Sequence, residues 1–181
     1  MLATVVLSQF KGIDTQLASM PSFWRHSLAC SIAARSIARL RREPNVERFF
    51  VAGLLHDIGS LAIYQMLPER SQLALERHRD SDKPLDEVER AVIGCDHAAV
   101  GAALMTSWTL PPFFRDATAN HHSAGSRGHT PATAVVHVSD LLVQTLDLGS
   151  NGEMRLPRLS PDARELAGLA PGALELLLPA P

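Results

Sequence analysis

Cysteine is scarce in this chain, because only two of its 181 residues are cysteines. Cys30 and Cys95 lie in apolar helical patterns and lack CxxC spacing, the usual sign of a cysteine-based zinc or redox site. We interpret both as small core residues of a protein in a reducing compartment.

A basic excess and a long apolar run are also missing. The formal net charge of -2 and the pI near 6.4 argue against a dedicated nucleic-acid binder. No stretch approaches the roughly 20 apolar residues of a membrane span. Residues 1–12 are apolar but lack the basic region and cleavage site of a signal peptide. We therefore predict a soluble, cytoplasmic protein that binds neither nucleic acid nor membrane.

The patterning predicts an all-α fold. Hydrophobic residues make up 46% of the chain and recur at helical spacing, with no sustained period-two alternation and no internal repeat. Helices are expected at about 1–10, 22–42, 46–56, 61–67, 68–79, 85–95, 97–108, 110–122 and 132–146, with a polar loop at 123–131. Residues 1–147 form the predicted helical domain. Residues 148–181, with five prolines, are expected to be a loosely packed tail.

Several histidines fall on the apolar faces of these helices. His26 shares a stripe with Cys30 and Ile37, and His56, His97 and His121 also face inward. Asp140 is a weaker case, because it shares its side with the polar residues His137 and Gln144. His78 and His129 have polar neighbours in the sequence, so we expect them at the surface. His137 is either exposed or a partner of the inward-facing residues.

A single inward histidine is most often a hydrogen-bonded core residue. A set of five imidazoles and two carboxylates would be costly to bury without mutual partners or a cation. A metal ion removes that cost, because imidazole and carboxylate are usual ligands of iron, manganese and zinc, and helical bundles build such sites from facing side chains. A helical scaffold whose histidines pair only with one another remains an alternative.

Four ordered segments resemble the HDOD family, the HD-related output domains of bacterial signalling proteins. They are "FWRHSLACSIAARSIA", "AGLLHDIG", "DHAAVGAALMTSWTLPPFFRDATANHH" and "HVSDLL", within a match that runs from about residue 2 to residue 146. The resemblance implies a helical bundle of the HD superfamily with a central metal site, related to the HD-GYP cyclic-dinucleotide phosphodiesterases. Full-length family members carry another helical lobe before this stretch, so an apolar face is expected to need cover from a partner.

The resemblance also implies a set of seven ligands for one or two ions of iron, manganese or zinc. The pattern H…HD…D falls on His26, His56, Asp57 and Asp140, and the extra histidines of dinuclear relatives fall on His97, His121 and His122. Asp57 would bridge two metals. One metal would be held by His26, His56 and Asp140, and the other by His97, His121 and His122.

The chain departs from the HD-GYP pattern at three places. Ser60 stands where those enzymes have a lysine able to meet a phosphate. The paired histidines are followed by "SAGSRGH" and not by a Gly-Tyr-Pro motif, and Ser22 replaces a glutamate of trinuclear relatives.

We therefore expect a signalling module that binds a partner protein, a second copy of the domain or a nucleotide ligand. The alternative is a metal-dependent phosphohydrolase, acting on a cyclic dinucleotide or another nucleotide, in which Asp57 orients the attacking water.

Overall fold

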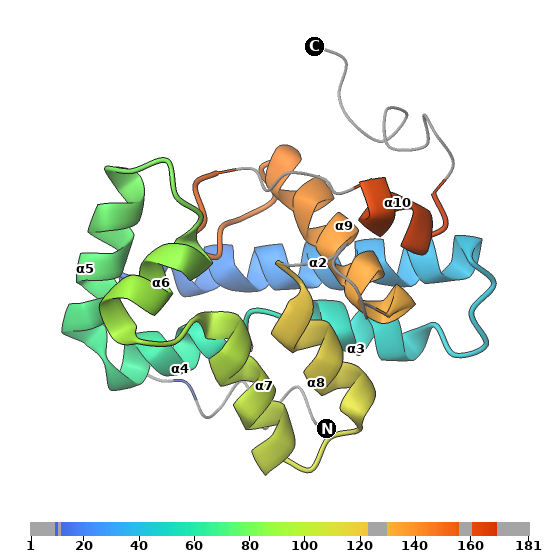
Figure 1. Cartoon of the computed structure of the whole chain (residues 1–181), viewed down its shortest axis with the longest axis horizontal. Helices are drawn as coiled ribbons and strands as arrows, with labels where there is room; N and C mark the ends of the chain where they lie inside the picture. The colour runs from blue at the N-terminus through green and yellow to red at the C-terminus, as the bar shows by residue number, and fades with distance from the viewer. Residues whose placement is uncertain (1–9, 11, 123–129, 156–160, 170–181) are drawn as a thin grey trace.

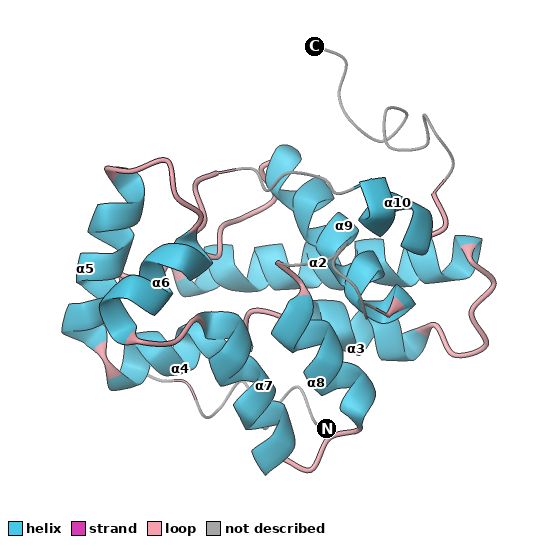
Figure 2. Ribbon diagram, viewed as in Figure 1, coloured by secondary structure: helices cyan, strands magenta, loops and turns pink. Residues whose placement is uncertain are grey.

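The computed structural model describes residues 10, 12–122, 130–155 and 161–169, and these residues form helices and loops without a strand (Figures 1 and 2). The all-α prediction is confirmed. The predicted opening helix, apart from Phe10, lies outside the described residues, as do His129 and most of the predicted polar loop. The helices are α2 (Met20–Leu40), α3 (Glu47–Leu55), α4 (Ile58–Met66), α5 (Pro68–Arg79), α6 (Leu85–Ile93), α7 (His97–Ser107), α8 (Pro112–Asn120), α9 (Pro131–Thr145) and α10 (Pro161–Leu166).

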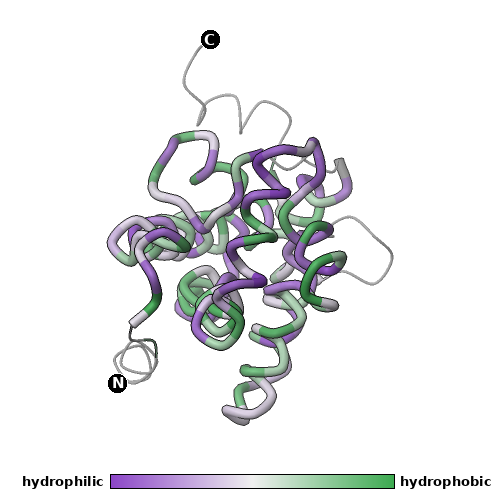
Figure 3. Tube along the Cα trace, turned by 90° about the vertical axis from the view of Figure 1, so that its left-hand side faces the viewer, coloured by the Kyte–Doolittle hydropathy of each residue, from purple (hydrophilic) through white to green (hydrophobic). Residues whose placement is uncertain are grey.

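The long helix α2 runs through the middle of the molecule. Helices α3 and α9 pack against it, α4 packs against α7, and α5 pairs with α6 at one end (Figure 1). Apolar and polar segments alternate along the helices, so that each has a face to bury (Figure 3). One apolar cluster joins the C-terminal half of α2 to α3, α8, α9 and residues 167–169, and a second joins the N-terminal half of α2 to α4 and α7.

Contrary to the expectation that no stretch approaches a membrane span, residues 47–66 are long and apolar enough to cross a membrane by length and composition. It is broken into α3 and α4, and 72% of its most apolar window is buried inside the molecule. Most of this stretch therefore belongs to the core of the helical fold.

The break between α3 and α4 lies at His56 and Asp57. Asp57 occupies the position before α4, where aspartate usually caps the helix, yet its carboxylate makes no capping hydrogen bond. Two residues later, Gly59 lets α4 approach α7 closely, because a Cβ at Gly59 would collide with the His97 carbonyl oxygen and lie 2.6 Å from the Gly101 nitrogen. This close crossing brings the Asp57 segment against the first residue of α7.

Two expectations about the periphery were wrong. The segment 149–155 is not loosely packed: Tyr64 donates a hydrogen bond to the Asn151 carbonyl at 3.2 Å, and Asn151 is 4% exposed. His78 is not on the surface. It is fully buried, with Nε2 2.8 Å from Glu153 Oε1 and Nδ1 2.9 Å from the Lys83 carbonyl oxygen. Helix α10, at the start of a second packed stretch, was also not expected. Residues 156–160 and 170–181 of the predicted tail lie outside the described residues.

The Gly59–His97 crossing gives a stability prediction. Gly59→Ala should lower the free energy of unfolding by about 3 kcal/mol, because the added methyl group forces two helix backbones apart. Gln65→Ala, at an exposed position of the same helix, should change it by less than about 0.5 kcal/mol. Urea unfolding of both variants measures this difference, and equal stabilities would show that α4 and α7 are not so tightly packed.

Candidate metal centre

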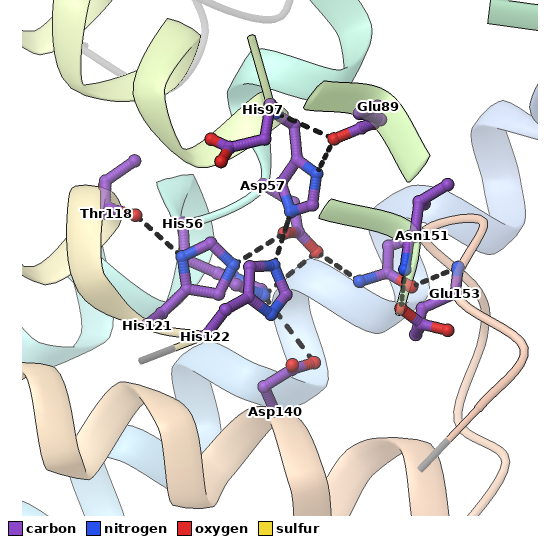
Figure 4. A network of polar contacts seen from close by, with 12 residues as sticks. His56, Asp57, Glu89, His97, Thr118, His121, His122, Asp140, Asn151 and Glu153 are labelled. Atoms are coloured by element: carbon purple, nitrogen blue, oxygen red, sulfur yellow. Dashed lines mark hydrogen bonds and ion pairs between the residues drawn. The ribbon is translucent and has the colours of Figure 1, made fainter. Parts of the chain in front are cut away.

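Two groups of potential metal ligands meet beside the α3–α4 break (Figure 4). Within each group, one donor atom per residue lies within 4.8 Å of every other donor. The first group is His26, Cys30, His56 and Asp140, and the second is Asp57, His97, His121 and His122. The structure thus brings together all seven residues predicted from the sequence, and it adds Cys30.

The Asp57 carboxylate lies between the two groups. Its Oδ2 atom is 3.4 Å from His26 Nε2 and 2.9 Å from His56 Nε2. Its Oδ1 atom is 3.6 Å from His97 Nε2 and 3.4 Å from His121 Nε2. One carboxylate therefore presents one oxygen to each group, which is the arrangement that a bridging ligand requires.

Asp140 completes the first group from α9. Its Oδ1 atom is 3.1 Å from His26 Nε2 and 3.7 Å from His56 Nε2. Gln144, one turn later on the same helix, donates from Nε2 to both carboxylate oxygens at 2.9 Å. Gln144 therefore fixes the orientation of the carboxylate.

Three imidazoles are oriented by hydrogen bonds from Nδ1. The acceptors are the Gly53 carbonyl for His56 at 2.8 Å, the Thr118 carbonyl for His121 at 2.7 Å, and Glu89 Oε2 for His97 at 2.6 Å. Each bond leaves Nε2 as the inward-facing nitrogen. This outer support of the ring is typical of histidines that bind metals.

Several inward-facing atoms lack a hydrogen bond. Nε2 of His56, Nε2 of His121 and Oδ1 of Asp57 are buried and make none. Unsatisfied buried polar atoms are rare and costly. Because these atoms converge on two shared positions, a divalent cation at each position would satisfy them. The donor atoms therefore fit a pair of metal ions.

In the metal-free protein, protonated imidazoles would balance the negative charge of the buried carboxylates. Burial alone lowers the pKa of His26, but Asp140 and Asp57 outweigh it and raise that pKa to about 10. Burial is likewise outweighed at His97, where Glu89 raises the pKa to about 10. Burial also raises the pKa of Asp140, yet the adjacent imidazoles of His26 and His56 hold it well below its ordinary value. Protons on the imidazoles thus neutralise the buried carboxylates where metal ions otherwise would.

Exposure differs between the predicted ligands. Six of the seven are at most 2% exposed, and His122 is only partly buried. His122 Nε2 lies 2.6 Å from His97 Nε2. The pKa of His122 is well below its ordinary value, because the site is buried and because His121 and His97 lie nearby.

The prediction missed two supporting residues. Glu89 Oε2 accepts hydrogen bonds from both the backbone nitrogen and Nδ1 of His97. Its position beside Val88 on the buried face of α6 was the sequence signal that could have predicted this role. Asn151 donates to Asp57 Oδ2 at 2.7 Å, from a segment with no sequence signal (Figure 4). His137 lies beside the site as a partner and is not exposed, since its Nδ1 donates to the His121 carbonyl at 2.8 Å.

Comparison with known proteins places this arrangement in a family. The sequence model of the HDOD domain matches residues 1–124. The chain belongs to the HDOD family. An uncharacterised protein of Treponema pallidum is 24% identical over 111 residues, which are 60% of this chain and 21% of that protein.

Three solved structures share the fold. An HDOD domain protein of unknown function from Geobacter sulfurreducens has a TM-score of 0.75 and 24% identity, over 95% of this chain and 60% of that one. A putative phosphohydrolase from Shewanella amazonensis has a TM-score of 0.77 and 20% identity, over 97% and 65%. The MmoQ response regulator of Methylococcus capsulatus has a TM-score of 0.67 and 25% identity, over 91% and 64%. This HDOD chain therefore spans less than two thirds of the length of these three structures.

The raised histidine pKa values give a pH prediction. Because the folded pKa values of His26 and His97 lie above the unfolded value of about 6.5, their contribution to stability is complete below that pH and is lost as pH rises toward about 10. The melting temperature of chelator-treated protein should therefore fall between about pH 6.5 and pH 8.5, below the range in which unfolded cysteine ionises. Metal-loaded protein should show no such fall. If the melting temperatures of the chelator-treated and metal-loaded proteins changed in parallel with pH, the idea that metal ions replace the protons on His26 and His97 would be contradicted.

Proposed function

We propose that this HDOD domain is a cytoplasmic signalling module that holds divalent metal in the two ligand groups joined by Asp57. The observation that carries the proposal is the position of the Asp57 carboxylate, which offers Oδ2 to His26 and His56 and Oδ1 to His97 and His121. Two ions sharing this carboxylate would neutralise the buried charge that protonated imidazoles otherwise balance.

The donor atoms indicate the class of metal. Imidazole nitrogen and carboxylate oxygen suit iron, manganese and zinc, while the scarcity of oxygen donors disfavours calcium and magnesium. Glu89 and Gln144 would act as the outer support that keeps His97 and Asp140 in binding orientation.

Two observations favour a signalling role over hydrolysis. Ser60, in place of the lysine of HD-GYP enzymes, is 1% exposed. Among the described residues, no lysine or arginine forms an ion pair with any of the seven proposed ligands. A phosphate reaching the metals would therefore lack the lysine that the HD-GYP pattern places at the position of Ser60.

The second candidate function is a metal-dependent phosphohydrolase. The shared carboxylate favours it, because paired ions with a common ligand are the usual arrangement in enzymes that hydrolyse phosphoesters. The Shewanella amazonensis protein of the same fold is named a putative phosphohydrolase. In this reading the partly exposed His122 marks the side from which a nucleotide would approach, and Asp57 would orient the attacking water.

A partner surface would lie on α2. Leu28 and Ile32, one turn apart, are 48% and 47% exposed although the opposite side of the helix is buried. We place the contact with a signalling protein or a second copy of the domain on this apolar pair.

Metal content tests the main proposal. Protein purified without chelator should contain one to two equivalents of iron, manganese or zinc, measured by elemental analysis. Asp57→Asn should contain less metal than the parent protein measured in parallel, because the variant loses the shared anionic ligand. Asp80→Asn, at an exposed position, is the matched control and should keep the full content. Protein free of metal at neutral pH would contradict the proposal.

Metal removal should also destabilise the folded protein. At a free metal concentration 100 times the dissociation constant, occupancy adds about 2.7 kcal/mol to the free energy of unfolding. Chelation should therefore lower the melting temperature of the parent protein, and it should lower that of Asp57→Asn by less. An identical response of the two proteins would show that the stabilising metal is bound elsewhere.

Hydrolysis distinguishes the two candidate functions. As a signalling module, the metal-loaded protein should not cleave a cyclic dinucleotide or a generic phosphodiester in a chromatographic assay. Metal-dependent cleavage that Asp57→Asn abolishes would establish the phosphohydrolase instead. Turnover that survives this substitution would belong to a contaminating enzyme.

A further inference from the structure

Cys30 lies inside the first ligand group, although the sequence pattern indicated only a small core residue. It follows His26 by one turn of α2 and is fully buried. Its Sγ atom is 3.6 Å from His26 Nε2 and within 4.8 Å of the donor atoms of His56 and Asp140. The Nε2 atom of His56, which makes no hydrogen bond, belongs to the same group.

Three of the six separations among these four donors lie near those around a tetrahedral ion. An ion held at about 2.3 Å from sulfur and about 2.0 Å from nitrogen or oxygen separates a sulfur–nitrogen pair by about 3.5 Å and the other pairs by about 3.3 Å. The observed separations are 3.6 Å from Cys30 Sγ to His26 Nε2, and 3.1 Å and 3.7 Å from Asp140 Oδ1 to His26 and His56 Nε2. Neighbouring donors of an octahedral ion of this size would lie closer, at about 3 Å.

We propose that Cys30 is a thiolate ligand of the first metal and makes this position a closed, zinc-selective structural site. The inference rests on the proposed metal binding and names the metal of one position. Two imidazoles, one thiolate and one carboxylate supply four protein donors, and zinc sites with four protein ligands are structural, whereas catalytic sites keep a position open for water. Soft thiolate favours zinc over manganese.

The charge balance supports a thiolate here. Cys30 loses its thiol proton when the metal binds, and the thiolate and the Asp140 carboxylate together neutralise a divalent ion in a fully buried position. Asp57 Oδ2, which also accepts a hydrogen bond from Asn151 at 2.7 Å, borders the same position, so the shared carboxylate adds to these four donors and leaves the position closed. The second group has no sulfur donor and includes the partly buried His122, so the two positions differ in chemistry.

Cobalt substitution tests the assignment spectroscopically. Chelator-treated protein is titrated with Co²⁺, bound cobalt is counted after desalting, and the near-ultraviolet spectrum is recorded for a thiolate-to-cobalt charge-transfer band. The band should grow with one equivalent of cobalt. Binding without the band would overturn the role of Cys30 and leave the proposed metal binding intact, whereas failure to bind cobalt would overturn both.

Matched cysteine variants assign the sulfur. Cys30→Ser should abolish the band while cobalt still binds at the second group, and Cys95→Ser should retain the band. A band that survives Cys30→Ser, or one lost in Cys95→Ser alone, would overturn the proposal.

Zinc-edge X-ray absorption of the parent protein provides a test that needs no variant. It should show one sulfur neighbour at about 2.3 Å from zinc. A shell of only nitrogen and oxygen neighbours would overturn the proposal even if Cys30→Ser fails to fold.

Discussion

The buried carboxylate of Asp57 is the constraint on which the rest of the structure depends. A negative charge with no exposure is very costly unless positive partners surround it. Here the partners are imidazoles from α2, α7 and the ends of α3 and α8. Because every one of these elements must reach the same carboxylate, the site fixes how the helices cross. Gly59 shows the consequence, since α4 and α7 meet at a distance that no side chain could tolerate.

The same buried charge links stability to occupancy. In the metal-free protein, protons on His26 and His97 balance the carboxylates, and the pKa of each imidazole rises to about 10. In the proposed metal-bound form a divalent ion would replace these protons, so metal binding and proton release would be coupled. The site therefore serves as a structural link among several helices. A ligand that changes its occupancy would change the packing of the whole bundle, which suits a module that transmits a signal.

The sequence predicted most of the helices from local periodicity, and the resemblance to the HDOD family implied the seven candidate ligands. Helical spacing placed His26 and His56 on apolar faces, and the ordered motifs extended the set to His122 and Asp140. Residues whose roles depend on the path of a loop were missed. Asn151 and the burial of His78 both follow from the return of residues 149–155 across α4 and α5, which no periodicity encodes. Cys30 was placed on the correct face, but a buried cysteine has the same sequence pattern whether or not it binds metal.

Anomalous diffraction from crystals of the protein purified without chelator tests the central claim most directly. Data collected at the iron, manganese and zinc edges locate each ion and identify its element. The account predicts two peaks on either side of the Asp57 carboxylate, with the zinc peak beside Cys30 and Asp140. A single peak remote from Asp57, or no peak at any of the three edges, would contradict it and leave a helical HDOD domain whose histidines bind only one another.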